Sequence, residues 1–245
     1  MLKIRFYFFL NTIAFVALVF HPQFCLAQAY SGNACAGKMS AELKSQFQLG
    51  HLPAQDGIPF SFYEKFSSSY LQVPPQKLSA QKLEFADEEE QAIQHDKESC
   101  QFTVRSLSDA DPKTAWCEGV PGDGLDEVAL IFTPVVAKMK IWNGYGKSPE
   151  AFQNNNRVKK IRIIIFEGAN FTTAFSTSEE NHVPSLIRRA QQDFELKDVN
   201  AFQNITLTHL PQVAPDRQLV LGIQILAVYR GSQFQDTCLS AVQSQ

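Results

Sequence analysis

The sequence lacks the short motifs that mark many catalytic and nucleotide-binding sites. It contains no G-x-S-x-G elbow, no phosphate-binding glycine loop and no H-E-x-x-H zinc motif. It also has no excess of positive charge, since its 245 residues carry a formal net charge of −3. Nucleic-acid-binding domains need a strongly basic face. We therefore expect neither a nucleic-acid partner nor an enzyme.

The apolar run at residues 6–20 is too short to cross a bilayer, which needs about 20 apolar residues. It follows the basic residues Lys3 and Arg5 and precedes a small-x-small pattern at residues 27–29. This arrangement is typical of a signal peptide, with a retained anchor as the alternative. We expect residues 1–29 to be removed, which leaves a secreted or periplasmic protein without a stable membrane anchor.

Cysteines are few, and none are spaced as C-x-x-C, the pattern typical of tetrahedral zinc. Removal of residues 1–29 would leave Cys35, Cys100, Cys117 and Cys238. In an exported protein, four cysteines favour two disulfides. The sequence alone permits three ways of pairing them.

Two regions of the chain differ in pattern. Residues 30–98 are polar and punctuated by proline, with short helices expected at 40–47 and 88–94, so they predict an N-terminal arm or helical cap. Residues 99–245 show alternating apolar and polar positions between turn residues, which favours an antiparallel sandwich or barrel. The expected strands are residues 127–132, 138–143, 158–166, 194–197, 205–209 and 218–229.

The acidic stretch at residues 109–124 permits two interpretations. Oxygen atoms of Asp109, Asp111 and Thr114 can converge on calcium, which prefers six to eight oxygen ligands. Alternatively, the aspartates accept hydrogen bonds from their own backbone in an Asx-turn. In the calcium interpretation, Trp116 is expected to fill the core beneath the loop.

Aromatic and amide side chains gather in a second stretch, at residues 142–157. Trp142, Tyr145, Asn156 and Arg157 combine flat rings with polar groups, as sugar-binding surfaces do. We take these four residues as the candidate ligand site. The alternative is a hairpin turn, because Asn-Gly is a strong turn signal.

One acidic cluster could support catalysis. Asp123, Asp126 and Glu127 lie close in sequence and could form an acid pair, so an uncharacterised hydrolase is a further hypothesis. Carboxylates beside glycine turns are more often turn formers.

Several strings together resemble a known family. In order they are DADPKTAWCEG, GDGLDEVALIF, KIWNGYGKS, NNNRVKKIRI, FELKD and ILAVYRGSQFQDTCLS. They are similar to the discoidin-like (coagulation factor 5/8 type C), galactose-binding-like domain. The resemblance is closest to the version in bacterial exported proteins that accompanies a streptococcal NAD glycohydrolase and its translocation.

This resemblance implies an all-β, jelly-roll β-sandwich at residues 99–245 with a short, partly helical N-terminal extension. It implies a non-catalytic module that recognises a glycan or cell-surface protein and requires no cofactor. The alternative is a structural or adaptor protein of the envelope that binds another protein. Fold analogy is a weak warrant for function.

The resemblance also bears on calcium and on the cysteines. Relatives with calcium resemble D-G-D-x-x-T-x-W, followed by an acidic residue near the C-terminus. Here Ala110 replaces the glycine, and residues 239–242 contain no acid. The resemblance places Cys117 and Cys238 on neighbouring segments, which implies a Cys117–Cys238 disulfide in place of calcium and a Cys35–Cys100 pair.

Overall fold

The computed structural model describes residues 37–53, 55–56, 65–72, 100–131, 134–169, 182–183 and 185–245. The expected signal peptide, Cys35 and the expected helix at 88–94 lie outside these residues. No helix in the described part is long and apolar enough to cross a membrane. The helices are α1 (Ala41–Leu49), the 3-10 helix η4 (Val104–Ser108) and α4 (Pro149–Asn154).

The strands are short at the N-terminal end and long in the centre of the sheet. They are β1 (Gly37–Lys38), β2 (His51–Leu52), β3 (Gln55–Asp56), β4 (Lys65–Ser67), β5 (Trp116–Cys117), β6 (Val128–Ile131), β7 (Lys138–Asn143), β8 (Asn156–Ala169), β9 (His182–Val183), β10 (Leu186–Glu195), β11 (Phe202–Thr206), β12 (Arg217–Tyr229) and β13 (Thr237–Ser244).

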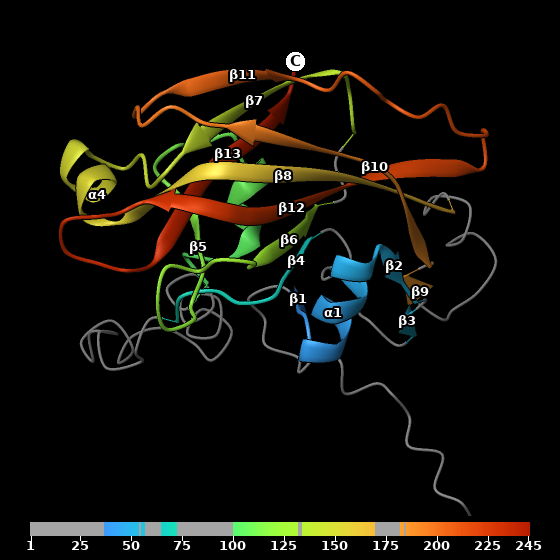
Figure 1. Ribbon diagram of the computed structural model, residues 1–245, viewed down its shortest axis with the longest axis horizontal. Helices are drawn as coiled ribbons and strands as arrows, with labels where there is room; N and C mark the ends of the chain where they lie inside the picture. The colour runs from blue at the N-terminus through green and yellow to red at the C-terminus, as the bar shows by residue number, and fades with distance from the viewer. Residues whose placement is uncertain are drawn as a thin grey trace, which may run out of the picture.

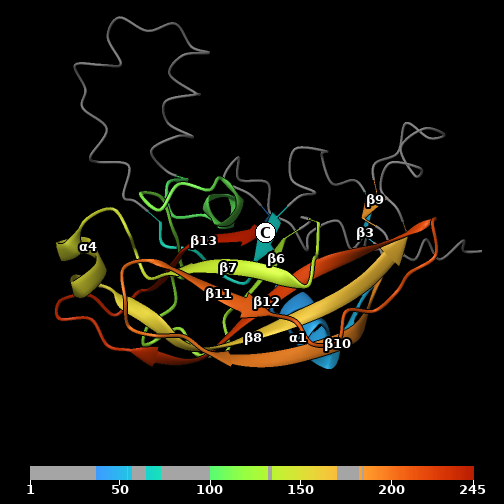
Figure 2. The same cartoon turned by 90° about the horizontal axis from the view of Figure 1, so that it is seen from above.

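These strands form two packed layers (Figures 1 and 2). One layer has the order β6-β12-β8-β10, with every pair antiparallel. In the other, β13 pairs with β5 and β7, and β7 pairs with β11. The layers join at one end, where the start of β13 runs parallel to the start of β8. The expected all-β sandwich is confirmed, although its strands are not all antiparallel.

Two hydrophobic cores lie on opposite faces of the β8 layer. Side chains on alternating positions of β8 and β12 point between the two layers, because successive strand residues face opposite sides. This main core contains Ile161, Ile163, Ile165, Leu221, Ile223, Ile225, Met139, Ile141, Leu239 and the fully buried Trp116. The second core lies under α1 and contains Leu43, Phe47, Phe66, Val128, Leu130, Ile164, Phe166, Leu186 and Val220.

Helix α1 has clear start and stop signals. The Ser40 side chain accepts a hydrogen bond from the Leu43 amide (3.1 Å), and Gly50 ends the helix at φ +87°. Serine is a preferred N-cap, and glycine adopts this left-handed conformation without strain. Leu43 and Phe47 lie four residues apart on the buried face. The helix expected at 40–47 is therefore present, with a slightly longer C-terminal end.

The N-terminal segment also contributes strands to the sheet. β4 pairs with β6, β1 pairs with β4, and β2 pairs with the start of β10. The described part of residues 30–98 thus extends the sheet edge and covers one of its faces.

Several strands differ from expectation, among them β11, which runs from Phe202 to Thr206 where residues 205–209 were expected. β10 runs from Leu186 to Glu195, whereas only its end was expected, because LIRRAQQDFE is largely exposed and lacks an apolar alternation. β13 was not expected as a strand because its buried positions include the polar residues Thr237 and Ser240.

We predict that Phe47→Ala lowers the free energy of unfolding by about 3–4 kcal/mol. The ring is fully buried and lies 5.1 Å from that of Phe166, and its loss would leave a cavity in the second core. Urea denaturation measures the change. Leu49→Ala is the matched control, because Leu49 lies in the same helix and is 69% exposed. Equal stability of the two variants would show that α1 does not pack on the sheet.

Candidate functional site

A pocket of about 270 Å³ lies at the end of the sandwich where β12 connects to β13. Its walls are the β12–β13 connection, the start of β8 and part of the loop between β5 and β6, near α4 in Figure 1. We call it the end pocket. It is lined by Asp123, Asn156, Arg230, Gly231, Ser232, Gln233, Phe234 and Gln235.

The connection that forms one wall is held against α4. The backbone amides of Ser232 and Phe234 donate to the carbonyls of Gln153 (3.0 Å) and Asn154 (2.8 Å). Gly231 lies so close to this turn that a Cβ atom there would come within 2.3 Å of the Asn154 oxygen. The wall is therefore positioned by backbone contacts.

Asn156 holds three parts of the pocket together. Its side-chain nitrogen donates to the Gln235 carbonyl (2.7 Å) and to Asp123 Oδ1 (3.3 Å). Its side-chain oxygen accepts from the Gly231 amide (2.7 Å). The residue is only 2% exposed, so it acts mainly by fixing the pocket walls.

The end pocket carries an ion pair and an exposed aromatic ring. Arg230 donates to Asp123 Oδ2 at 2.9 Å, although the arginine side chain is 80% exposed. Phe234 is 45% exposed, although the connection that carries it is well bonded.

Of the four residues expected to bind a ligand, the structure places only Asn156 in the end pocket. Arg157 is 8% exposed and forms a bidentate pair with Asp198 at 2.9 and 2.7 Å. It also donates to the carbonyls of Asn155 and Arg230. Its hydrogen bonds are directed into the protein.

Trp142 and Tyr145 lie outside the lining of the end pocket. The Trp142 indole donates to Asn200 Oδ1 (2.9 Å), and its ring packs edge-on against Phe202. Tyr145 packs edge-on against Phe102, and burial raises the pKa of its hydroxyl. Both rings are half-buried. Their role in binding stays a prediction.

The residues that the sequence interpretation missed are in the stretch RGSQFQ, residues 230–235. It combines a cation, an aromatic ring, a hydroxyl and two amides, the same composition that drew attention to residues 142–157. The stretch follows the long strand β12, and such connections commonly carry function.

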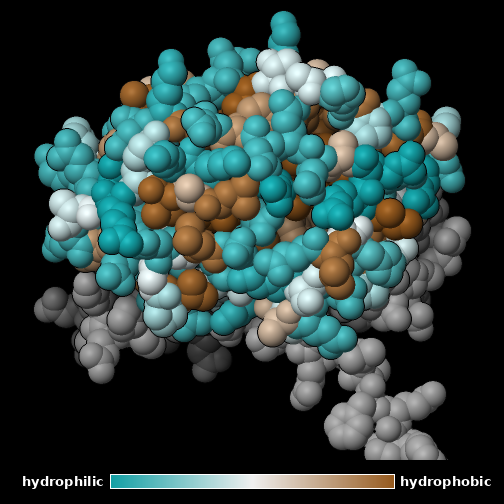
Figure 3. Space-filling view, in the orientation of Figure 1, coloured by the Kyte–Doolittle hydropathy of each residue, from teal (hydrophilic) through white to brown (hydrophobic). Residues whose placement is uncertain are grey.

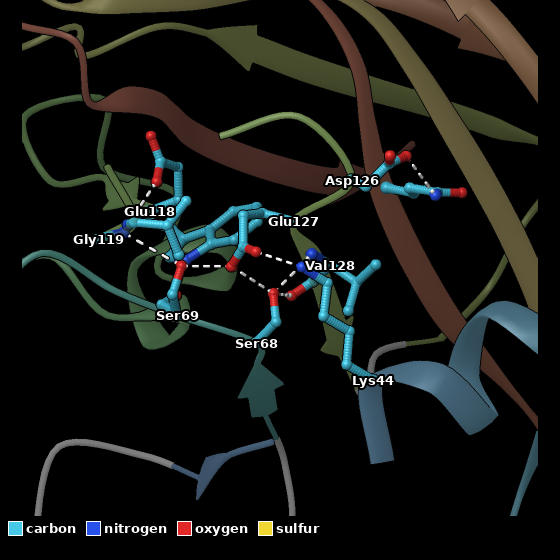
Figure 4. Close-up of polar contacts among 11 residues, drawn as sticks. Lys44, Ser68, Ser69, Glu118, Gly119, Asp126, Glu127 and Val128 are labelled. Atoms are coloured by element: carbon cyan, nitrogen blue, oxygen red, sulfur yellow. Dashed lines mark hydrogen bonds and ion pairs between the residues drawn. The ribbon is translucent and has the colours of Figure 1, made fainter. Parts of the chain in front are cut away.

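A second polar cluster is buried behind the loop between β5 and β6 (Figure 4). Glu127, 3% exposed, forms an ion pair with Lys44 of α1. It also accepts hydrogen bonds from the hydroxyls of Ser68 (2.6 Å) and Ser69. Burial would raise the pKa of Glu127, but these three donors hold it below its ordinary value. The carboxylate is ionised and fully compensated.

Residues 68 and 69 also form hydrogen bonds with both ends of the loop between β5 and β6. The Ser69 hydroxyl accepts from the Gly119 amide (3.1 Å), and the Ser69 carbonyl accepts from the Trp116 indole (2.9 Å). At the other end, Ser68 exchanges hydrogen bonds with Val128. Residues 68–69 therefore position the loop that carries Asp123.

Glu118 is a buried carboxylate of a different kind. It is fully buried, and its two oxygens accept from the backbone amides of Thr237 (2.9 Å) and Val120 (2.8 Å). The pKa of Glu118 is raised to about 7, mainly by burial. The hydrogen bonds from the two amides lower this pKa, and the negative charges of Asp236 and Glu127 raise it.

The three carboxylates of the hydrolase hypothesis have separate partners. Asp123 bonds to Arg230 and Asn156, Asp126 accepts from Gln224 (3.0 Å), and Glu127 is buried with Lys44. Only Asp123 lines the end pocket. They do not form an acid pair there.

A disulfide joins Cys117 of β5 to Cys238 of β13, the pairing that the resemblance implied. The two residues face each other in the β5–β13 ladder. Cys100 is also disulfide-bonded. The expected partner, Cys35, lies outside the described residues.

Residues 79–245 match the family described as the NAD glycohydrolase translocation F5/8 type C domain. The chain belongs to this family. The β-sandwich fold is consistent with this family. The family description also supports the expectation of a binding or translocation module. No curated protein matches the chain.

Two solved structures are similar to this F5/8 type C domain. A family 32 carbohydrate-binding module of C. perfringens NanJ, solved with galactose, has a TM-score of 0.34 and 13% identity, with 58% of this chain and 83% of that chain covered. The arabinofuranosyltransferase AftD from Mycobacteria has a TM-score of 0.37 and 8% identity, with 77% of this chain and 11% of that chain covered.

The candidate calcium loop of the F5/8 type C domain is closed by its own hydrogen bonds. Asp109 accepts from the Asp111 amide (2.9 Å), and Asp111 accepts from the Lys113 amide (2.9 Å). The Thr114 hydroxyl lies 2.6 Å from Asp109 Oδ2. Ala110 takes a left-handed conformation, φ +65°.

Further ligands for calcium are not gathered at this loop. The described residues contain no group of three or more His, Cys, Asp or Glu side chains suited to a metal. From β13, Ser240 reaches the Pro112 carbonyl (3.0 Å) with a hydroxyl rather than a carboxylate. The contacts at this loop favour the turn interpretation, and the calcium assignment of Asp109, Asp111 and Thr114 stays a prediction.

We predict that neither excess calcium nor EDTA changes the melting temperature, because the loop lacks a third carboxylate. Differential scanning fluorimetry measures this. Reduction of the disulfides is the positive control and should lower the melting temperature, because a 121-residue separation makes the Cys117–Cys238 cross-link a strong constraint on the unfolded chain. A rise in melting temperature with calcium would restore the metal interpretation.

We predict that Lys44→Met lowers the free energy of unfolding by about 2 kcal/mol at pH 7, because it leaves the Glu127 carboxylate without its cation. This is less than the penalty for breaking a fully buried ion pair, because Lys44 is partly exposed. The lowered pKa of Glu127 stabilises the fold above the ordinary value of 4.5, and this contribution is lost as the pH falls. The penalty should therefore shrink below pH 4.5.

Urea denaturation at pH 7 and at acidic pH measures both effects. Lys38→Met is the control, because Lys38 is exposed. A penalty of the same size at both pH values would contradict an electrostatic role for Lys44.

Proposed function

We propose that this F5/8 type C domain is a non-catalytic module that binds a carbohydrate in the end pocket. The observation that supports it most directly is the exposed Phe234 ring beside a small polar pocket. Binding sites for small ligands combine a concave surface with a few convergent polar groups. An aromatic face provides a surface on which the C–H groups of a sugar ring pack.

The polar groups of the pocket suit sugar hydroxyls. Gln233 and Gln235 carry amides that both donate and accept, Ser232 carries a hydroxyl, and Arg230 carries donors on an exposed side chain. The charges of Arg230 and Asp123 compensate each other across 2.9 Å. We therefore expect a neutral saccharide rather than a strongly charged one.

The residues that line the end pocket favour binding over hydrolysis. Glycoside hydrolysis uses two carboxyl groups that flank the scissile bond. Among the residues that line the end pocket, Asp123 is the only one with a carboxyl group, and it is held by Arg230 and Asn156.

We predict that Phe234→Ala weakens saccharide binding about tenfold, or about 1.4 kcal/mol, because the sugar would lose the apolar ring face on which its C–H groups pack. A glycan array with the exported chain would identify the sugar, and calorimetry would measure the affinity. Ile187→Ala is the control, since Ile187 is 49% exposed on β10, outside the pocket lining.

Two results would contradict this assignment. Unchanged affinity of Phe234→Ala for a sugar that the protein binds would place the ligand elsewhere, with Trp142 and Tyr145 as the next candidates. If no glycan is bound at all, the adaptor alternative, a protein ligand, would be favoured.

A further inference from the structure

Glu118 lies directly behind the two segments that form the end pocket. One of its oxygens accepts from the Val120 amide, on the loop that leads to Asp123. The other accepts from the Thr237 amide, which follows the pocket wall at Gln235. A single buried carboxylate thus joins both walls from behind.

Further contacts couple these walls around Glu118. The Thr237 hydroxyl donates to the Asp123 carbonyl at 2.7 Å. Gly124, at φ +64°, packs so tightly on Glu118 that a Cβ atom there would lie 2.4 Å from its carboxyl carbon. The Asn156 amide donates to the Asp236 carbonyl at 3.0 Å. Glu118 is therefore connected to both walls of the end pocket.

Glu118 differs from Glu127 in the groups that surround its carboxylate. Its hydrogen-bond donors are neutral backbone amides, and the acidic side chains that act on it are Asp236 and Glu127. Lys44 pairs with Glu127, and Arg230 pairs with Asp123, so neither of these cations is paired with Glu118. Cys117 and Cys238, on the same elements, are oxidised and do not titrate.

We propose that Glu118 is a proton-controlled clamp, which holds the end pocket in its binding conformation when ionised and loosens it when protonated. The proposal rests on the assignment of the end pocket as the ligand site. An ionised carboxylate accepts strong hydrogen bonds from both amides. Protonation converts one oxygen into a hydroxyl, which is a poor acceptor and needs a buried acceptor for its own proton.

The transition falls in the physiological range. Burial raises the pKa of Glu118 to about 7, whereas hydrogen bonds from Lys44, Ser68 and Ser69 keep the pKa of Glu127 low. The raised value means that ionisation opposes folding, so the fold gains stability as the pH falls from about 7 towards 4.5. Protonation therefore leaves the domain folded, and it loosens the pocket only through the lost amide contact, with the carboxyl group still buried; a loosening that hydrated Glu118 would be favoured by its ionised form instead.

The clamp can be tested without any ligand. We expect the amide resonances of Val120 and Thr237, and the Glu118 carboxyl carbon itself, to titrate together near pH 7 in NMR spectra of the wild-type chain. In Glu118→Gln the amide titrations should disappear, while in Glu150→Gln, the matched exposed control, they should persist. Amides that do not titrate, or that still titrate in Glu118→Gln, would overturn the clamp.

Calorimetry with the saccharide found on the array then tests the effect on binding. The wild type and Glu150→Gln should lose affinity severalfold between pH 8 and pH 5.5, whereas Glu118→Gln should bind weakly at both. Equal wild-type affinity at both pH values would overturn the clamp but leave the pocket assignment intact. If the amides titrate but no glycan binds at any pH, the pocket assignment fails and the proton-dependent contact remains.

Discussion

The antiparallel ladder between β8 and β12 determines where the other elements can lie. Ile163 pairs with Ile223 in this ladder, and both side chains point into the main core. On the opposite face, Gly222 leaves room for the rings of Phe47 and Phe166. Because the ladder is apolar on both faces, it requires a second sheet on one side and α1 on the other. Its end also places Asn156 and Arg230 at the pocket.

Two glutamates in one loop show how local donors set the behaviour of a buried charge. Glu127 receives a cation and two hydroxyls from α1 and from residues 68–69, whereas Glu118 receives only backbone amides. The donors of Glu127 precede residues 79–245, the range matched by the family. The N-terminal segment therefore supplies part of the electrostatic balance of the F5/8 type C domain.

Much of the sandwich is predictable because β7, β8 and β12 carry an apolar pattern of their own. β10 and β13 are not predictable in this way: the first is a mostly exposed edge, and the second buries Thr237 and Ser240 through contacts with distant residues. The composition of residues 142–157 indicated both Asn156 and Arg157 as site residues. Asn156 lines the end pocket, whereas Arg157 pairs with Asp198, which is 41 residues away. Whether a polar side chain faces solvent or the interior depends on such long-range partners, which local sequence does not show.

The position of β13 has a consequence for the order of assembly. This strand lies between β5 and β7 and pairs with the start of β8. Three earlier strands therefore lack one of their pairing partners until β13 is in place. Contacts between residues far apart in sequence form slowly, because a long loop must close first. The sandwich therefore remains without this strand until residues 237–244 are available to pair. Until then the two layers lack the parallel contact between β13 and β8 that joins them at one end.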